Sequence, residues 1–172
     1  MTPSQVARKY LGQTEKPGNS GFNDATFEDK MEEVGFQKGH AWCAYFAELV
    51  FKEAIPEREE LDTLFSGSTV LTFRNFRDAA YMISQVPRVD HLVIWQTMKN
   101  GKPMATGHAG IVSEVTSLWE FKSIEGNTNS HGGREGFEVS EKDRKVLANV
   151  ENGLKILGFI AISPVSTLVL NT

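Results

Sequence analysis

The chain has 172 residues, of which 40% are hydrophobic and 23% charged, as in ordinary globular proteins. This length suits one domain, and we expect residues 1–172 to form a single domain. The single cysteine excludes an internal disulfide framework and any zinc site built from several cysteines. The formal net charge of −4 argues against a broad phosphate-binding surface, so we expect no nucleic-acid partner.

The sequence has no segment typical of membrane insertion or secretion. The longest apolar region, 154–170, is interrupted by Lys155, Gly158 and Pro164. About 20 apolar residues are needed to span a bilayer. The first ten residues lack the apolar stretch of a secretory signal. We therefore expect no membrane insertion, and we expect synthesis in the cytoplasm, with delivery by another route if the protein acts elsewhere.

The residues up to about 84 have the pattern of helices. Thr2 and Gln5 form a capping box with Pro3 at the first helical position. The segment 42–54 is apolar on nearly all sides, which is typical of a buried central helix, and Pro56 prevents its continuation. The expected helices cover residues 3–11, 27–34, 42–54, 57–65 and 72–84.

The remaining residues have the pattern of strands. Short apolar, β-branched or alternating runs predict strands at 92–95, 109–115, 119–124, 137–139 and 155–163. Helices that precede strands favour an α+β fold, with the helices packed on a mostly antiparallel sheet of five to six strands.

Cys43 is the residue with the clearest potential for chemistry. It lies at the expected start of the central helix, where free N–H groups and the helix dipole favour a thiolate. A histidine partner would lower the thiol pKa further. The alternative is an inert, buried thiol that acts as a small core residue.

A later hairpin offers that partner. If the turn is centred between Thr116 and Ser117, His108 lies opposite Glu125, with Cβ atoms about 5 Å apart. A carboxylate beside an imidazole fixes its tautomer and stabilises its cation. Asn127 lies two residues further along the same strand, where it could orient His108 or donate to an oxyanion, although its surroundings are also typical of a turn.

Two further residues precede or adjoin the cysteine. His40 and Trp42 are candidates for the lining of a substrate cleft, with an exposed loop histidine and a core tryptophan as the alternatives. The sequence contains no His-Glu-x-x-His zinc motif, no Gly-x-Ser-x-Gly motif and no glycine-rich phosphate loop. We therefore expect neither a metal nor a cofactor.

Three segments in this order resemble the CHAP family of cysteine- and histidine-dependent amidohydrolases and peptidases, which is related to the NlpC/P60 enzymes. They are residues 42–46 (Trp-Cys-Ala-Tyr-Phe), 107–112 (Gly-His-Ala-Gly-Ile-Val) and 124–128 (Ile-Glu-Gly-Asn-Thr). The segment 7–22 is similar to the lead-in of many bacterial and phage members. The resemblance covers about residues 4–163.

The resemblance implies a papain-like α+β fold and a set of roles. Cys43 would be the nucleophile, His108 the general base, Glu125 the residue that orients His108, and Asn127 an accessory polar residue. The implied activity is cleavage of an amide bond in peptidoglycan, as an N-acetylmuramoyl-L-alanine amidase or an endopeptidase. Such a protein would be a phage lysin or a secreted antibacterial effector, acting on the cell wall or in the periplasm after release or injection.

The implied partners are stem or cross-bridge peptides of the wall, bound by a monomer, and an inhibitor or immunity protein is compatible with this role. The sequence departs from the family at Asp90 and His91, where members usually carry Gly-Asp, and in the two expected helices between 57 and 84. It also lacks the Asp-x-Asp-Gly loop that holds calcium in some relatives. Two other functions remain open: an amidase of a small peptide conjugate, and a non-catalytic domain that binds wall peptide or protein.

Overall fold

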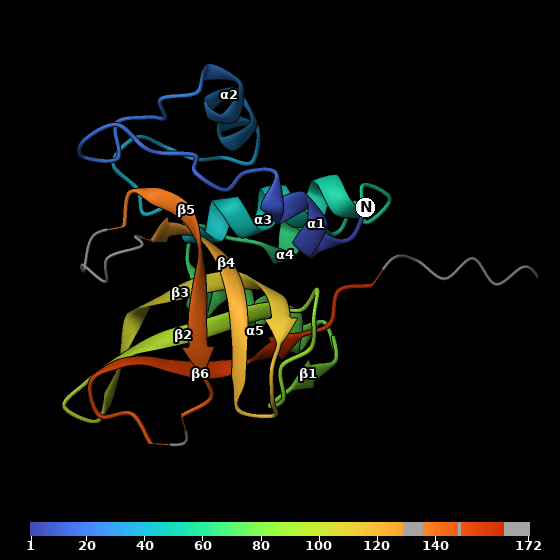
Figure 1. The fold of residues 1–172 in the computed structure, drawn as a ribbon, viewed down its shortest axis with the longest axis vertical. Helices are drawn as coiled ribbons and strands as arrows, with labels where there is room; N and C mark the ends of the chain where they lie inside the picture. Colours follow the sequence, from blue (N-terminus) through green and yellow to red (C-terminus); the bar gives the residue numbers. More distant parts are fainter. Residues whose placement is uncertain (129–135, 148, 164–172) are drawn as a thin grey trace, which may run out of the picture.

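The computed structural model describes residues 1–128, 136–147 and 149–163. Within these residues the helices precede the strands along the chain (Figure 1). The helices are α1 (Pro3–Arg8), α2 (Ala25–Glu33), α3 (Cys43–Ala54), α4 (Leu61–Leu64) and α5 (Thr69–Asp78). The strands are β1 (Ile83–Ser84), β2 (Leu92–Lys99), β3 (Lys102–Val115), β4 (Glu120–Thr128), β5 (Glu138–Lys145) and β6 (Gly153–Ile160).

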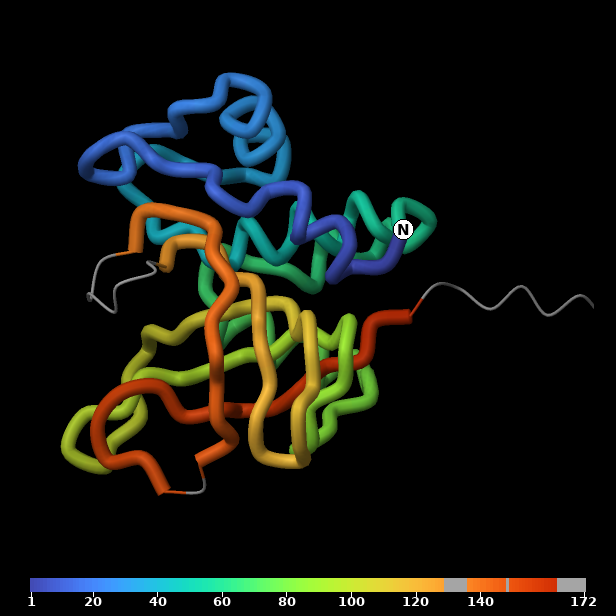
Figure 2. Tube along the Cα trace, in the orientation of Figure 1, coloured from blue at the N-terminus to red at the C-terminus, as the bar shows by residue number. Residues whose placement is uncertain are grey.

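The strands form one antiparallel sheet in the order β1-β6-β2-β3-β4-β5. The helices α1, α3 and α4 lie along one side of this sheet, and α2 lies beyond them (Figure 1). The trace in Figure 2 shows β4 and β5 side by side, with the end of β4 and the start of β5 next to the helical layer. The predicted α+β fold with a mostly antiparallel sheet of five to six strands is confirmed.

The helix α3 is the centre of the helical layer. It extends over 12 residues, eight of which are buried, as its apolar sequence predicts. The ring of Phe46 in this helix packs edge-on against the ring of Tyr10 in the N-terminal segment. On the sheet side its buried residues share a core cluster with Ile111 in β3 and Ile124 in β4. The other face of the sheet carries a second, smaller cluster. It consists of Val93, Trp95, Val112, Phe121 and Phe159.

Several element boundaries correct the expectations from sequence. The acidic segment 57–65 contains only the four-residue helix α4. The helix expected at 72–84 is shifted toward the N-terminus and ends at Asp78, because Ala80 adopts a left-handed φ of 60° that interrupts the helix. Ile83 then pairs with Ile160 as part of the short edge strand β1.

The sheet is longer than expected because β2 and β3 continue into a hairpin. Asn100 and Gly101 connect them with φ values of 51° and 72°, the left-handed geometry of a two-residue turn. Residues 102–106 of β3, which follow this turn, are all exposed and show no alternation of buried and exposed positions.

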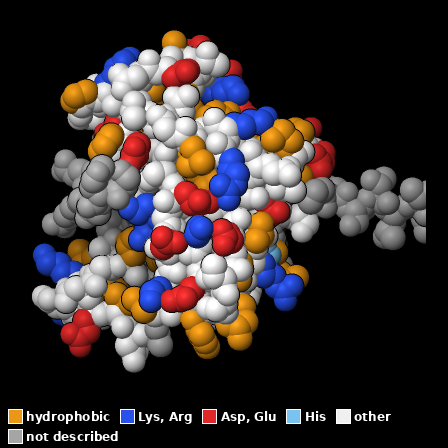
Figure 3. Space-filling view, in the orientation of Figure 1, with side chains coloured by type: hydrophobic (Ala, Val, Ile, Leu, Met, Phe, Trp, Pro, Cys, Tyr) orange, Lys and Arg blue, Asp and Glu red, His pale blue; other side chains and the backbone are white. Residues whose placement is uncertain are grey.

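Charges of both signs are interspersed over β4 and β5 on the face shown in Figure 3. Lys122 pairs with Glu114 at 3.0 Å, and Lys145 pairs with Glu120 at 3.0 Å. Such exposed pairs contribute little to stability, about 0–1 kcal/mol each. Among the helices of the described residues, none is long and apolar enough to cross a membrane.

Candidate active site

Cys43 is the first residue of α3 and a free cysteine that is 6% exposed. The preceding residue, Trp42, has a non-helical backbone and makes no side-chain hydrogen bond to the first turn. The first N–H groups of this helix are therefore left uncapped by Trp42. Together with the positive end of the helix dipole, they favour a negative charge on the sulfur.

His108 lies between Cys43 and Glu125. Its Nε2 is 2.8 Å from Oε2 of Glu125 in β4. The side chain of Cys43 interacts with the imidazole on its other side and raises the pKa of His108. Because Nε2 is engaged by the carboxylate, Nδ1 is the ring nitrogen left for the sulfur. A thiol, a base and a group that orients the base are thus neighbours that interact, which is the arrangement of an activated nucleophile.

Glu125 is 0% exposed and accepts four hydrogen bonds. Ser123 donates to Oε1 at 2.5 Å, and Nε of Arg144 donates to the same oxygen at 2.8 Å. On Oε2, an Nη2 of Arg144 donates at 2.5 Å and His108 contributes the fourth bond. A carboxylate with all its acceptor positions filled in this way is ionised, so Nε2 of His108 carries a proton directed at it.

The charges of these groups shift their protonation equilibria. Burial by itself lowers the pKa of His108, but the charges of Cys43 and Glu125 and the hydrogen bonds to both outweigh burial, so this pKa lies well above its usual 6.5. Burial raises the pKa of Glu125, but the charge of His108 and the hydrogen bonds from Arg144 and His108 outweigh it and lower the pKa to about 2. The site therefore favours a protonated imidazole beside an ionised carboxylate.

Trp95 supports the imidazole from the neighbouring strand. It lies directly opposite His108 in the pairing of β2 with β3, with ring centroids 5.7 Å apart. Its indole also stacks on Phe121 at 6.4 Å. The guanidinium carbon of Arg144 lies 5.2 Å from the centroid of the indole. His108 and Arg144 thus rest against the same aromatic side chain.

The register between β3 and β4 corrects the expected hairpin. Ile111 pairs with Ile124, because the turn after β3 is centred further along the chain than expected. This register places Gly110, rather than His108, opposite Glu125. The contact with His108 is consequently diagonal. Gly110 makes it possible, since a Cβ at that position would lie 2.7 Å from Cγ of Glu125.

Asn127 contacts the backbone near the cysteine. Its amide is oriented so that Nδ2 donates to the carbonyl of Gly136 at 2.6 Å and Oδ1 accepts from the N–H of Trp42 at 3.2 Å. Its own φ is 51°, in the left-handed region. Asn127 therefore fixes the residue that precedes Cys43 and holds the start of α3 against the end of β4.

The two residues expected to line a cleft lie in different surroundings. Trp42 is 0% exposed and packs edge-on against Phe22 at 5.0 Å, so its ring is part of the core and offers no surface to a ligand. His40 is exposed, with Nδ1 3.3 Å from the hydroxyl of Tyr45. Its position just before α3 is compatible with contact to a bound molecule.

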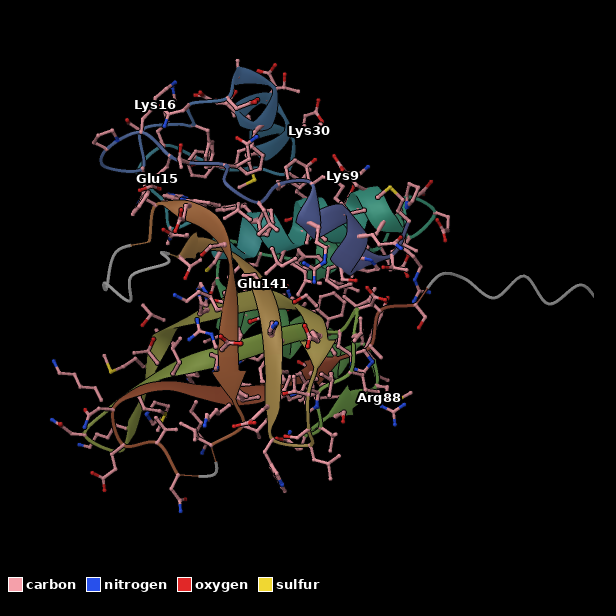
Figure 4. All side chains as sticks on the ribbon, in the orientation of Figure 1. Lys9, Glu15, Lys16, Lys30, Arg88 and Glu141 are labelled. Atoms are coloured by element: carbon pink, nitrogen blue, oxygen red, sulfur yellow. The ribbon has the colours of Figure 1, made fainter. Side chains whose placement is uncertain are left out.

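The lead-in segment reaches the site through Glu15. The carboxylate of Glu15 accepts from the indole N–H of Trp42 at 2.5 Å and from the side-chain amide of Asn19. Thr14 forms a bridge with Glu138 of β5. Figure 4 shows Glu15 beside the upper end of β5. The buried ring of Trp42 is therefore held in place from two sides, which fixes the backbone next to Cys43.

Three residues of the site escaped the sequence analysis: Ser123, Arg144 and Trp95. The alternation along β4 could have identified Ser123, because it points to the same face as Glu125. Arg144 gave no signal, since it lies in the charged run 141–145, which has the composition of a solvent-exposed segment.

Among the residues that the structure describes, no group of three or more His, Cys, Asp or Glu side chains could hold a metal ion. No family model matches the chain, and the comparisons with curated proteins and with solved structures found no match.

Proposed function

We propose that the protein is a cysteine-dependent hydrolase with a papain-like arrangement, and that it cleaves an amide bond in the peptide of peptidoglycan. It would act as an N-acetylmuramoyl-L-alanine amidase or as an endopeptidase. The observation that carries the proposal is the position of His108, in contact with Cys43 on one side and Glu125 on the other.

The chemistry follows from these contacts. The thiolate of Cys43 attacks the carbonyl carbon of the amide and forms a C–S bond. The backbone N–H of Cys43 at the start of α3 stabilises the negative charge on the carbonyl oxygen. Protonated His108 gives its proton to the leaving nitrogen as the C–N bond breaks, and the product is a thioester and a free amine.

Hydrolysis of the thioester completes the cycle. Neutral His108 removes a proton from water, and the oxygen attacks the thioester carbon. The C–S bond breaks, the carboxylic acid leaves, and the thiolate forms again beside protonated His108. Glu125 stays ionised throughout and holds the imidazole in one orientation.

The substrate class rests on the resemblance to the CHAP family. The three segments that carry it contain Cys43, His108 and Glu125, which are the residues in contact in the structure. A wall substrate implies action on the cell wall or in the periplasm after release or injection, as a phage lysin or a secreted antibacterial effector.

The test is hydrolysis of purified peptidoglycan and of defined muropeptides, with products identified by mass spectrometry. Cys43→Ala and His108→Ala should each lower the rate at least about 10³-fold, since both act in the bond-breaking steps. His91→Ala, a histidine beyond these contacts, is the matched control and should keep the rate of the wild type. Full activity in folded Cys43→Ala would refute the mechanism.

One observation favours a different function. Cys43 is only 6% exposed, which also suits an inert thiol in a domain that binds wall peptide without cleaving it. Alkylation by iodoacetamide at pH 6 separates the two, because an activated thiolate reacts there and an ordinary buried thiol does not. The masses of products from muropeptides and from small peptide conjugates identify the substrate. They thereby distinguish a wall hydrolase from an amidase of small peptide conjugates.

A further inference from the structure

Arg144 makes the strongest set of contacts to the candidate site outside the three proposed catalytic residues. Its two donors form a fork on the two oxygens of Glu125, at 2.8 Å and 2.5 Å. Its guanidinium lies against the indole of Trp95, which also faces His108. The side chain of Arg144 is 25% exposed, whereas that of Glu125 is 0% exposed. This positive charge is thus directed into the protein, toward one carboxylate.

The balance of charge around Glu125 depends on Arg144. With Arg144 present, the buried carboxylate already has a positive partner. A thiolate at Cys43 and a proton on His108 then make a second neutral pair. Without Arg144, protonated His108 is the only positive partner that the described residues offer to both Glu125 and the thiolate, and this group of side chains carries a net negative charge. In a poorly solvated site such an excess charge disfavours the thiolate.

We propose that Arg144 is a positioning residue that balances the charge of Glu125 and thereby lets Cys43 ionise beside protonated His108. The inference deepens the proposed hydrolase function and rests on it. Arg144 acts through Glu125 and needs no contact with substrate. The fork also holds the carboxylate in the orientation that the diagonal contact with His108 requires.

The experiment measures the rate at which iodoacetamide alkylates Cys43 between pH 4 and pH 10, by mass spectrometry of the intact protein. Because the chain contains one cysteine, each added mass reports this thiol alone. In Arg144→Gln the midpoint of the profile should rise by about one pH unit, so that alkylation at pH values below the wild-type midpoint is about tenfold slower. Arg144→Lys keeps the charge but loses the fork, and its midpoint should stay within about half a unit of the wild type.

Arg77→Gln is the matched control, because Arg77 pairs with its neighbour Asp78 at the surface and its side chain is 57% exposed. Its profile should coincide with that of the wild type. Should Arg144→Gln fail to fold, Arg144→Met takes its place, since it keeps an apolar contact with Trp95. A folded neutral variant with the midpoint of the wild type overturns the inference. The inference is also overturned if the midpoint of Arg144→Lys rises as far as that of Arg144→Gln.

The profile of the wild type separates this inference from the proposed function. An ordinary midpoint near pH 8.5 in the wild type contradicts an activated nucleophile, and with it both proposals. A low midpoint that rises in Arg144→Gln, together with no cleavage of any muropeptide, supports the role of Arg144 and refutes the wall substrate.

Discussion

At the scale of single residues, the four hydrogen bonds on Glu125 determine what His108 can do. Both carboxylate oxygens are occupied, by Ser123, Arg144 and His108. Nε2 of His108 is held by this carboxylate. Proton transfer between the imidazole and the sulfur therefore goes through Nδ1. The orientation is fixed by the ring of Trp95 as well as by the carboxylate.

The absence of a side chain at Gly110 is a requirement of this geometry. Gly110→Ala should push Glu125 away from His108, because the new Cβ would lie 2.7 Å from Cγ of Glu125. We expect a destabilisation of about 1–3 kcal/mol, typical of overpacking in a core. We also expect at least tenfold slower alkylation of Cys43 at pH 6, measured beside a urea unfolding curve.

A second crowded glycine provides the control for that variant. At Gly158 a Cβ would lie 2.5 Å from Cγ2 of Ile83, in the pairing of β6 with β1. Gly158→Ala should lose a similar amount of stability while Cys43 reacts as in the wild type. Equal losses of reactivity in the two variants would show that Gly110 matters for general stability alone.

At the level of helices and strands, local sequence patterns predict some element boundaries well and others poorly. The central helix was predicted to within one residue, because its continuous apolar run ends at Pro56. The hairpin at Asn100 and Gly101 was missed, although Asn-Gly is a strong turn signal, because residues 102–106 are all exposed and lack the alternation typical of a strand. The end of α5 was misplaced because Ala80 leaves the helix in a left-handed conformation that alanine rarely adopts.

The junction between β4 and α3 depends on the side chain of Asn127. Asn127→Gly should destabilise the protein by about 1 kcal/mol, because glycine accepts the φ of 51° while the hydrogen bond to Trp42 is lost. Hydrolysis and alkylation of Cys43 should both slow, since the start of α3 is less firmly held. Asn100→Gly is the control, because Asn100 has the same φ of 51° and lies in the turn between β2 and β3. It should leave the reactivity of Cys43 unchanged.

At the scale of the whole molecule, the candidate site joins residues that no local pattern connects. The contact between His108 and Glu125 was predictable because one hairpin brings both strands together. Its true register was not predictable, since the length of the turn and a register shift between Val112 and Glu114 together decide it. Arg144 comes from a strand whose expected extent, 137–139, ended before it. The order of β3, β4 and β5 in the sheet, rather than any motif, brings Arg144 to the carboxylate.

The stability of the molecule should depend on pH through two buried carboxyl groups of opposite behaviour. Burial raises the pKa of Glu48 in α3 from 4.5 to about 7, so its contribution is present below pH 4.5 and is lost as the pH rises to 7. The pKa of Glu125 is lowered to about 2 by His108 and Arg144 despite its burial, so its contribution is lost as the pH falls below 4.5. Stability from these groups should therefore be greatest near pH 5.

Glu48→Gln tests the first of these contributions. In urea unfolding the variant should be more stable than the wild type at pH 8, by on the order of 2 kcal/mol, and the difference should be much smaller at pH 5. Glu57→Gln, at an exposed position after α3, should unfold as the wild type does at both pH values. A gain that is equal at pH 5 and pH 8 would contradict the assignment to Glu48.

The separation of Cys43 from Glu125 and Arg144 along the chain has a consequence for the growing polypeptide. Synthesis proceeds from the N-terminus, so the sulfur emerges about a hundred residues before the guanidinium. Until the last of these side chains has been added and the strands have paired, Cys43 lacks the neighbours that form the candidate site. If the proposed mechanism holds, Cys43 therefore becomes an activated nucleophile only after the chain has passed Arg144 and the sheet has formed.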